Sequence, residues 1–201
     1  MKEYIHATIS STLAWSGNIY DLLIVTYVHH YLEMAYNLNF AGVTLLFALG
    51  LIGRVIGGTL FGRLSDHLSS RKAVLMIGTA GYSVFGFLLP FSPSFLFLFI
   101  FRLLEGIFMG AQCTAGTALA YEQSPLDIKG FIVSIVQAGY GIGYALTAVS
   151  YILFIPTMPY GGWSIFLATS VIPLAIVPYT FIKVNELKEK GVTSISGEKL
   201  N

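Results

Sequence analysis

Charged residues and cysteines are both scarce in this chain of 201 residues. Asp, Glu, Lys and Arg make up only 10% of the sequence, whereas 55% is hydrophobic and the mean hydropathy is +0.75. This balance lies far outside the range of soluble globular domains and predicts an integral membrane protein. The single cysteine, Cys113, excludes an internal disulfide and a cysteine-rich metal site. The net charge of +1, spread over short loops, gives no reason to expect nucleic acid as a partner.

Catalytic pairings are also missing from the apolar stretches. They contain no Ser-Lys or Asp-Asp pair and no His-rich cluster of the kind that an intramembrane enzyme needs. The chain is therefore predicted not to be an enzyme, and neither a cofactor nor a metal ion is expected.

Long hydrophobic runs are present instead. About 20 apolar residues are needed to cross a bilayer as a helix, and the sequence offers six such runs. They predict an all-α membrane domain at 13–182, with spans at about 13–32, 40–62, 73–91, 94–119, 130–155 and 163–182. Residues 1–12 are expected to form an N-terminal segment, and residues 183–201 a polar tail.

Basic residues are distributed unequally over the predicted loops. The loops near 33–39, 90–94 and 156–162 contain no Lys or Arg. Nine basic residues flank the opposite side: Lys2, Arg63, Arg71, Lys72, Lys129, Lys183, Lys188, Lys190 and Lys199. Because positive loops stay in the cytoplasm, this asymmetry predicts a multi-pass protein of the cell membrane with both termini cytoplasmic.

Four ionisable side chains lie inside the predicted spans: Asp21, Arg54, Arg102 and Glu105. Each charge costs roughly 2.5 to 3.5 kcal/mol at mid-membrane on insertion scales, so four unpaired charges would cost about 10 kcal/mol. They must therefore pair or line a wet cavity. Such side chains usually mark the path of a substrate or a proton, which points to transport.

The fourth span predicts a single inward-facing stripe. Arg102, Glu105, Met109 and Gln112 fall within an arc of about 80° at 100° per residue. Two readings of the charges stay open. Arg102 and Glu105 can form an i,i+3 pair that only offsets their burial, or they can take part in proton coupling.

Asp21 has no basic neighbour at helical spacing within its own span. Its partner is expected to come from another helix, with Arg102 and Arg54 as the cations at membrane depth. A movable contact between an aspartate and an arginine acts as a proton switch. Asp21 is therefore a candidate proton carrier, and the alternative is a static structural pair.

Arg54 lies nine residues before Arg63, about 13 Å along a helix, which is too far to reach the interface comfortably. We expect it to face the cavity and attract an anionic substrate. Neutral hydrogen bonds to that substrate are expected from Tyr20, Gln112, Gln137 and Tyr140.

Glycine accounts for 21 residues, and several lie four apart within the spans. The GxxxG pairs are Gly53/Gly57, Gly58/Gly62, Gly106/Gly110 and Gly139/Gly143. Such pairs let helices approach closely in lipid, so the second, fourth and fifth spans are predicted to pack most tightly.

The loop between the second and third spans resembles a signature of the major facilitator superfamily. There a Gly precedes an Asp by four residues and a basic pair follows, as Gly62, Asp66, Arg71 and Lys72 do here. The loop of this chain is one residue longer, with Ser69 and Ser70 where a Gly is usual. The resemblance implies a cytoplasmic gate in which Asp66 and Arg71 form a network with an acidic residue at the end of the fourth span.

A second run is similar to the proton-coupled metabolite and organic-acid symporters of that superfamily. Its matching positions are Arg102, Gly106, Glu122, Pro125, Lys129 and Gly130, and among them Glu122 and Lys129 are expected at the cytoplasmic gate together with Gly62, Asp66, Arg71 and Lys72. The resemblance implies two inverted three-helix repeats, a midplane site and alternating access. Where such symporters usually have a Gln and an acid, this chain has Glu105 and Gln112.

The resemblance covers only the amino-terminal half of such a transporter. A second copy of the chain, a separately encoded half or a longer gene product could each complete the cavity. The leading hypothesis is a secondary transporter, or half of one, that moves a small metabolite with protons, an organic anion being one candidate. The alternative is a membrane subunit that binds or regulates without transporting.

Overall fold

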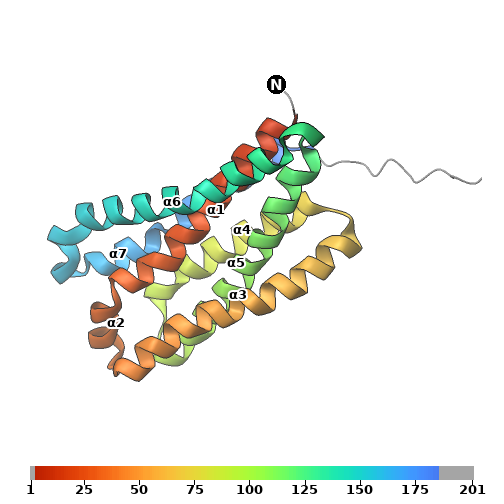
Figure 1. Cartoon of the computed structure of the whole chain (residues 1–201). Coiled ribbons are helices and arrows are strands. Elements are labelled where there is room, and N and C mark those ends of the chain that lie inside the picture. Colours follow the sequence, from red (N-terminus) through yellow and green to blue (C-terminus); the bar gives the residue numbers. More distant parts are fainter. Residues whose placement is uncertain (1–2, 186–201) are drawn as a thin grey trace, which may run out of the picture.

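The computed structural model describes residues 3–185, and all of its regular structure is helical (Figure 1). The α-helices are α1 (Glu3–Tyr27), α2 (His29–Tyr36), α3 (Phe40–Leu68), α4 (Arg71–Leu88), α5 (Phe95–Gln123), α6 (Lys129–Phe154), α7 (Gly162–Ala168) and α8 (Ile176–Lys183). Short 3₁₀ segments join them at η1 (Leu89–Phe91), η2 (Leu126–Ile128), η3 (Ile155–Tyr160) and η4 (Thr169–Ala175).

Five helical stretches in the described residues are long and apolar enough to cross a membrane. They are Phe40–Leu68, Arg71–Phe91, Phe95–Gln123, Leu126–Tyr160 and Gly162–Lys183. Each overlaps one of the predicted spans after the first. The remaining predicted span, 13–32, falls mainly on α1, which is long enough but carries Ser, Thr, Asn and Asp side chains on its buried faces.

The first helix differs from the predicted first span in both bounds. It begins at Glu3, so most of the segment predicted as an N-terminal extension is helical. It ends at Tyr27, and α2 begins as a separate helix after Val28. Hydrogen bonds from Ser10 to Thr180 and from His6 to Tyr179 attach the first turns of α1 to α8. The early residues therefore belong to the helix bundle. The polar tail predicted at 183–201 lies outside the described residues beyond 185.

The predicted sixth span is a broken helix. Residues 162–183 form α7, the 3₁₀ segment η4 and then α8. Pro173 lies within η4, where its ring removes a backbone donor and disfavours continuous α-helix. The break places Thr169 and Ser170 at the centre of the bundle, beside α1.

Helix ends follow local side-chain chemistry. The side chain of Asn39 caps α3 by accepting from the backbone of Gly42, and Ser70 caps α4 by accepting from Ala73. Asn37 and Ser69 adopt left-handed conformations where α2 and α3 end. These turns fix the directions of the second and third spans.

Glycines allow α3 and α5 to touch along their backbones. A Cβ added at Gly57 would lie 1.8 Å from the carbonyl oxygen of Ile107, and one at Gly53 would lie 2.4 Å from that of Leu103. From the other side, a Cβ at Gly106 would lie 2.3 Å from the carbonyl oxygen of Gly50. The close packing of the second and fourth spans, predicted from their GxxxG pairs, is therefore present.

The fifth span packs in the same way, whereas only one glycine of the Gly58/Gly62 pair contributes. Added Cβ atoms at Gly139 and Gly143 would lie 2.7 and 2.5 Å from carbonyl oxygens of α1. By contrast, a Cβ at Gly58 would meet only a methyl group at 3.7 Å, and one at Gly62 would meet nothing within 4 Å. The Gly58/Gly62 pair therefore takes part in the α3–α5 contact only through Gly58, whose backbone nitrogen would lie 2.4 Å from a Cβ added at Gly110 of α5.

Alanine substitutions should separate these two kinds of glycine. Gly57→Ala is expected to destabilise the bundle by about 3 kcal/mol, since the methyl group would overlap a backbone carbonyl that cannot rotate away. Gly62→Ala is expected to stabilise it by about 0.5 to 1 kcal/mol, because alanine favours the helix. Thermal unfolding of both variants in one detergent measures the difference. Equal stabilities would contradict the observed α3–α5 contact.

Candidate functional site

Three of the four membrane-level charges meet at the α1–α5 contact. Asp21, Arg102 and Glu105 are each fully buried, with 0% of their surface exposed. The Nη1 atom of Arg102 donates to Oε2 of Glu105 at 2.8 Å, and its Nη2 atom donates to the carbonyl oxygen of Leu22 at 3.3 Å. We call Asp21, Arg102, Glu105 and the adjacent Ser170 the acid cluster.

The acid cluster contains hydrogen-bonding atoms without partners. Within residues 3–185, no donor lies at the distance and angle of a hydrogen bond to either carboxylate oxygen of Asp21 or to Oε1 of Glu105. Nε of Arg102 and the hydroxyl of Ser170 are also unpaired. Asp21 lies in electrostatic range of Glu105 and Arg102, and Ser170 faces its carboxyl group. Such unpaired buried groups are costly in a folded protein and are a common mark of function.

The ion pair of the cluster is the intrahelical one. Asp21 was expected to pair with an arginine from another helix, but no cation lies within 4 Å of it among the described residues. Arg102 binds Glu105 instead, because a residue three positions along the same helix is already placed for contact. Two carboxyl groups thus share the surroundings of one guanidinium.

Two glycines make room for the acid cluster. A Cβ at Gly50 of α3 would lie 2.8 Å from Nε of Arg102. A Cβ at Gly86 of α4 would lie 2.9 Å from the Ser170 hydroxyl and 3.3 Å from Oε1 of Glu105. Five helical segments, α1, α3, α4, α5 and η4, therefore close around these groups and exclude solvent from them.

A second set of polar side chains lies one turn closer to the N-terminus of α1 than Asp21. Asn18 is fully buried, and its amide nitrogen donates to Oε1 of Gln112 at 2.7 Å and to the carbonyl oxygen of Met109 at 3.0 Å. Its amide oxygen accepts from Nη2 of Arg54 at 2.7 Å. We call Arg54, Asn18 and Gln112 the amide network. It connects α3, α1 and α5, directly beside the acid cluster.

Arg54 is the half-buried cation of this network. Its guanidinium lies 5.0 Å from the ring centroid of Trp15, and the Cys113 thiol lies against it. Among residues 3–185 no carboxylate forms an ion pair with Arg54. Tyr140 of α6 is within its electrostatic range. Arg54 thus keeps a positive charge that no acid of the described chain neutralises.

The other residues expected to bind substrate are placed differently. Tyr20 is buried, and its hydroxyl hydrogen-bonds Thr169 at 2.5 Å. Gln137 and Tyr140 are exposed on α6, where the rings of Tyr140 and Tyr144 are 5.2 Å apart. The structure joins Gln112 to Arg54 through Asn18, and it brings Tyr140 near Arg54. It does not bring Tyr20 or Gln137 into the amide network.

The residues of the signature loop meet at one end of the bundle. Nη2 of Arg71 binds Oδ1 of Asp66 at 2.7 Å, and its Nε binds Oε1 of Glu122 at 3.1 Å. Its Nη1 donates to the buried hydroxyl of Ser65 at 2.9 Å. We call Asp66, Arg71 and Glu122 the Arg71 network. It joins the end of α3, the start of α4 and the end of α5.

Three other residues expected at the gate lie outside the Arg71 network. Lys72 donates to the carbonyl oxygen of Phe181 at 2.9 Å, and Lys129 lies 4.3 Å from the ring centroid of Tyr121. Gly62 meets no neighbour closely. Lys72 therefore attaches the start of α4 to α8, while Lys129 attaches the start of α6 to α5.

The Arg71 network is partly exposed, so its loss should cost little stability. Arg71→Gln is expected to destabilise the bundle by less than about 1 kcal/mol for each lost ion pair. The difference from the unchanged protein should shrink in 1 M salt, because salt screens exposed charges. Thermal unfolding at low and high salt tests this. A large loss of stability that persists in salt would contradict it.

Asn18, Trp15 and Ser170 were not among the residues predicted for the site. Asn18 precedes Asp21 by three residues on the same face of α1, so spacing alone could have indicated it. Ser170 gave no such signal, since its position depends on the break in the sixth span. Among residues 3–185 no group of three His, Cys, Asp or Glu side chains could hold a metal ion.

Comparison with solved structures agrees with this architecture. An inward-open structure of the xylose transporter XylE from E. coli superposes with a TM-score of 0.80 at 23% sequence identity. The match covers 91% of this chain and 48% of that chain. A bacterial homolog of the human lysosomal transporter Spinster matches with a TM-score of 0.77 at 14% identity, over 92% and 45% of the two chains. At these identities the likeness shows the fold alone.

Sequence comparison gives related transporters. A probable 4-methylmuconolactone transporter of Cupriavidus pinatubonensis is 29% identical over 81% of this chain and 38% of its own length. The gallate transporter of Pseudomonas putida is 29% identical over 79% of this chain and 35% of its own length. The chain thus spans little more than a third of these curated relatives. Both are transporters, which agrees at the family level with the expectation of a non-enzyme.

The pattern that defines the Major Facilitator Superfamily matches residues 7–199, which is nearly the whole sequence. This match, the shared fold and the apolar helices all indicate a multi-pass membrane protein. The chain therefore belongs to the Major Facilitator Superfamily, as its signature loop indicated.

Proposed function

We propose that this chain is a proton-coupled secondary transporter, or half of one, that moves a small organic anion. The observation that carries the proposal is the acid cluster, in which two fully buried carboxyl groups accompany one guanidinium. A purely structural ion pair needs one acid for each base. The second acid, Asp21, is left with unused acceptor atoms in the sealed centre of the bundle.

A proton on one of the two carboxyl groups balances the charge of the acid cluster. With both acids ionised, one positive and two negative charges would lie out of contact with water, which is unfavourable. Adding one proton makes the cluster neutral. Asp21 then carries the coupling proton, while Arg102 and Glu105 set how readily it is held. Release requires a conformation that opens the cluster to water, as alternating access provides.

Arg54 is the residue proposed to attract the substrate. It is half-buried, carries a charge that no described acid neutralises, and lies one turn from the acid cluster. A carboxylate would replace the amide oxygen of Asn18 as its acceptor with a charge-assisted hydrogen bond. Relatives named for gallate, gentisate and benzoate transport support an aromatic carboxylate as the substrate class.

The Arg71 network is proposed to form the cytoplasmic gate. Five basic residues lie at the end of the bundle where α3, α5 and α8 end and α4 and α6 begin, namely Arg63, Arg71, Lys72, Lys129 and Lys183. The other basic residues of the predicted cytoplasmic side, Lys2, Lys188, Lys190 and Lys199, lie outside the described residues. This end would face the cytoplasm, with both termini on that side.

Six spans in two inverted three-helix repeats are proposed, with α1 as the first span and α7 to α8 as the last. Although α1 is less apolar than the others, its Ser, Asn and Asp side chains are buried in the bundle, so a bilayer would not meet them. The opposite wall of the cavity would come from a second half. A second copy, a separately encoded half and a longer gene product are all consistent with this arrangement.

Reconstitution into vesicles tests the proposal. A proton gradient directed into the vesicles is expected to drive uptake of benzoate, gallate or gentisate. Neutral xylose should not be taken up. The mass of the purified protein in detergent, measured on the preparation used for the vesicles, shows which assembly is active. Arg54→Gln should weaken binding of the transported carboxylate, whereas Arg63→Gln, which changes an exposed basic residue on the same helix, should not. A folded protein that binds one of these acids without transporting it would favour the binding or regulatory alternative.

A further inference from the structure

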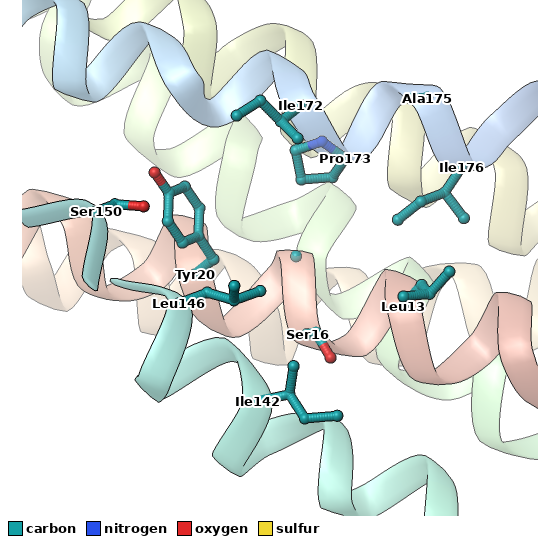
Figure 2. A pocket seen from close by; sticks show the side chains of 11 residues that line it. Leu13, Ser16, Tyr20, Ile142, Leu146, Ser150, Ile172, Pro173, Ala175 and Ile176 are labelled. Atoms are coloured by element: carbon teal, nitrogen blue, oxygen red, sulfur yellow. The ribbon is translucent and has the colours of Figure 1, made fainter. Parts of the chain in front are cut away.

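An apolar groove lies between α1, α6 and the segment from η4 to α8 (Figure 2). Its volume is about 350 Å³. One wall is a stripe on α6, formed by Ile142, Leu146 and Ser150 at intervals of four residues. Leu13 and Tyr20 mark the two ends of the α1 wall. An apolar cavity of about 150 Å³ holds benzene, so by proportion this groove can hold on the order of a dozen carbon atoms.

The hydroxyl groups in the groove already have partners. The Ser16 hydroxyl donates to the carbonyl oxygen of Thr12 at 2.9 Å. The Tyr20 hydroxyl hydrogen-bonds Thr169 at 2.5 Å and also contacts Ser150. Nothing in the lining is left to recognise a carboxylate or another strongly polar group. The groove therefore favours hydrocarbon over the substrates proposed for Arg54.

The rim of the groove is apolar and open. Ile142, Leu146 and Ile172 are 46%, 50% and 63% exposed, and all three belong to membrane-spanning segments. On α1 the groove residues lie on average about 120° around the helix from the stripe of Asn18 and Asp21. The groove is thus separate from the polar site and faces the acyl chains of a surrounding bilayer.

A cation lies beyond one end of the groove. Ile176 lines this end, and Lys183 follows seven residues later on the same side of α8, about 10 Å along the axis. Lys183 is exposed and forms no ion pair within residues 3–185. Its position at the end of a spanning segment suits a lipid headgroup, and its charge attracts an anionic one.

We propose that the groove binds one acyl chain of an anionic phospholipid whose headgroup contacts Lys183. The bound chain would lie against η4, where Pro173 packs on Gly17. The same segment holds Ser170 against the acid cluster. Such a lipid would therefore support the contact between α1 and the broken helix. This inference needs only a membrane-embedded chain, so it stands or fails independently of transport.

Photo-crosslinking in nanodiscs tests the groove. The probe is phosphatidylglycerol with a photoreactive diazirine in its acyl chain, and labelled peptides are mapped by mass spectrometry. Labelling is expected on residues 13–20 and 142–150. Leu146→Trp should fill the groove and reduce this labelling to background. The matched control, Ile152→Trp, adds the same side chain at a 64% exposed position of α6 outside the groove and should leave the labelling unchanged.

The headgroup contact is tested with a variant that leaves the groove intact. Lys183→Gln should lower labelling by the phosphatidylglycerol probe about fivefold and leave labelling by a phosphatidylcholine probe unchanged. Arg63→Gln, which replaces an exposed basic residue of α3, should leave labelling by both probes unchanged. Equal labelling of the unchanged protein and Leu146→Trp would overturn the proposal. Equal labelling by the two lipids would overturn its headgroup part.

Discussion

Replacing Asp21 by Asn is expected to abolish uptake driven by a pH gradient, down to the level of protein-free vesicles. Asn has the shape of a protonated Asp but cannot release a proton, so the coupling step is lost. Exchange of labelled for unlabelled substrate across the membrane needs no net proton movement and should continue. Parallel uptake and exchange assays in the same vesicles measure this split.

Stability provides the control for Asp21→Asn. Asp21 has no ion pair within 4 Å in the described residues, so losing its charge should not lower thermal stability. Glu33→Gln alters an acid outside the spanning segments and should leave both assays unchanged. Unchanged pH-driven uptake by Asp21→Asn would remove this residue from the proton path. Loss of exchange together with uptake would assign it to substrate binding instead.

Replacing Arg102 by Met is expected to destabilise the fold more than any other change considered for the charged sites. Arg102 is fully buried. Among the described residues it is the only cation that forms an ion pair with an acid of this cluster. Its removal leaves two carboxyl groups together without a compensating charge, at a cost of about 3 to 5 kcal/mol. Thermal unfolding, or the yield of monodisperse protein, measures the loss.

Matched variants separate the charge effect from lost packing. Glu105→Gln should be much milder, because Arg102 then has Asp21 as its remaining acid and the cluster stays balanced. The double variant Arg102→Met/Glu105→Met should regain most of the stability lost by Arg102→Met, since it removes both members of the bonded pair. A double variant as unstable as Arg102→Met alone would show that the guanidinium acts through packing and not through charge.

Patterns along a single helix predicted much of this protein. Hydropathy located five of the apolar stretches, and helical spacing placed Arg102, Glu105, Met109 and Gln112 on one buried face. The spacing of the signature loop led to the family. These features depend on neighbours in sequence, and the period of an α-helix converts them directly into faces.

Contacts between helices were harder to predict. The sequence left open which acid pairs with Arg102, and in the structure Arg102 pairs with Glu105 of its own helix and leaves Asp21 without an ion pair among the described residues. Asn18 joined Arg54 to Gln112 only because three helices converge on it. Ser170 reached the acid cluster because Pro173 and its neighbours break the sixth span. A hydropathy pattern carries no information on such three-dimensional choices.

Proton movement caused by substrate tests the central claim most directly. Vesicles containing the protein and a trapped pH indicator receive the transported carboxylate on one side, with no initial pH difference. Cotransport through the acid cluster predicts acidification of the lumen as substrate enters, and no such signal from Asp21→Asn under the same substrate gradient. Substrate entry without any proton movement in the unchanged protein, or an equal proton signal from Asp21→Asn, would contradict the account.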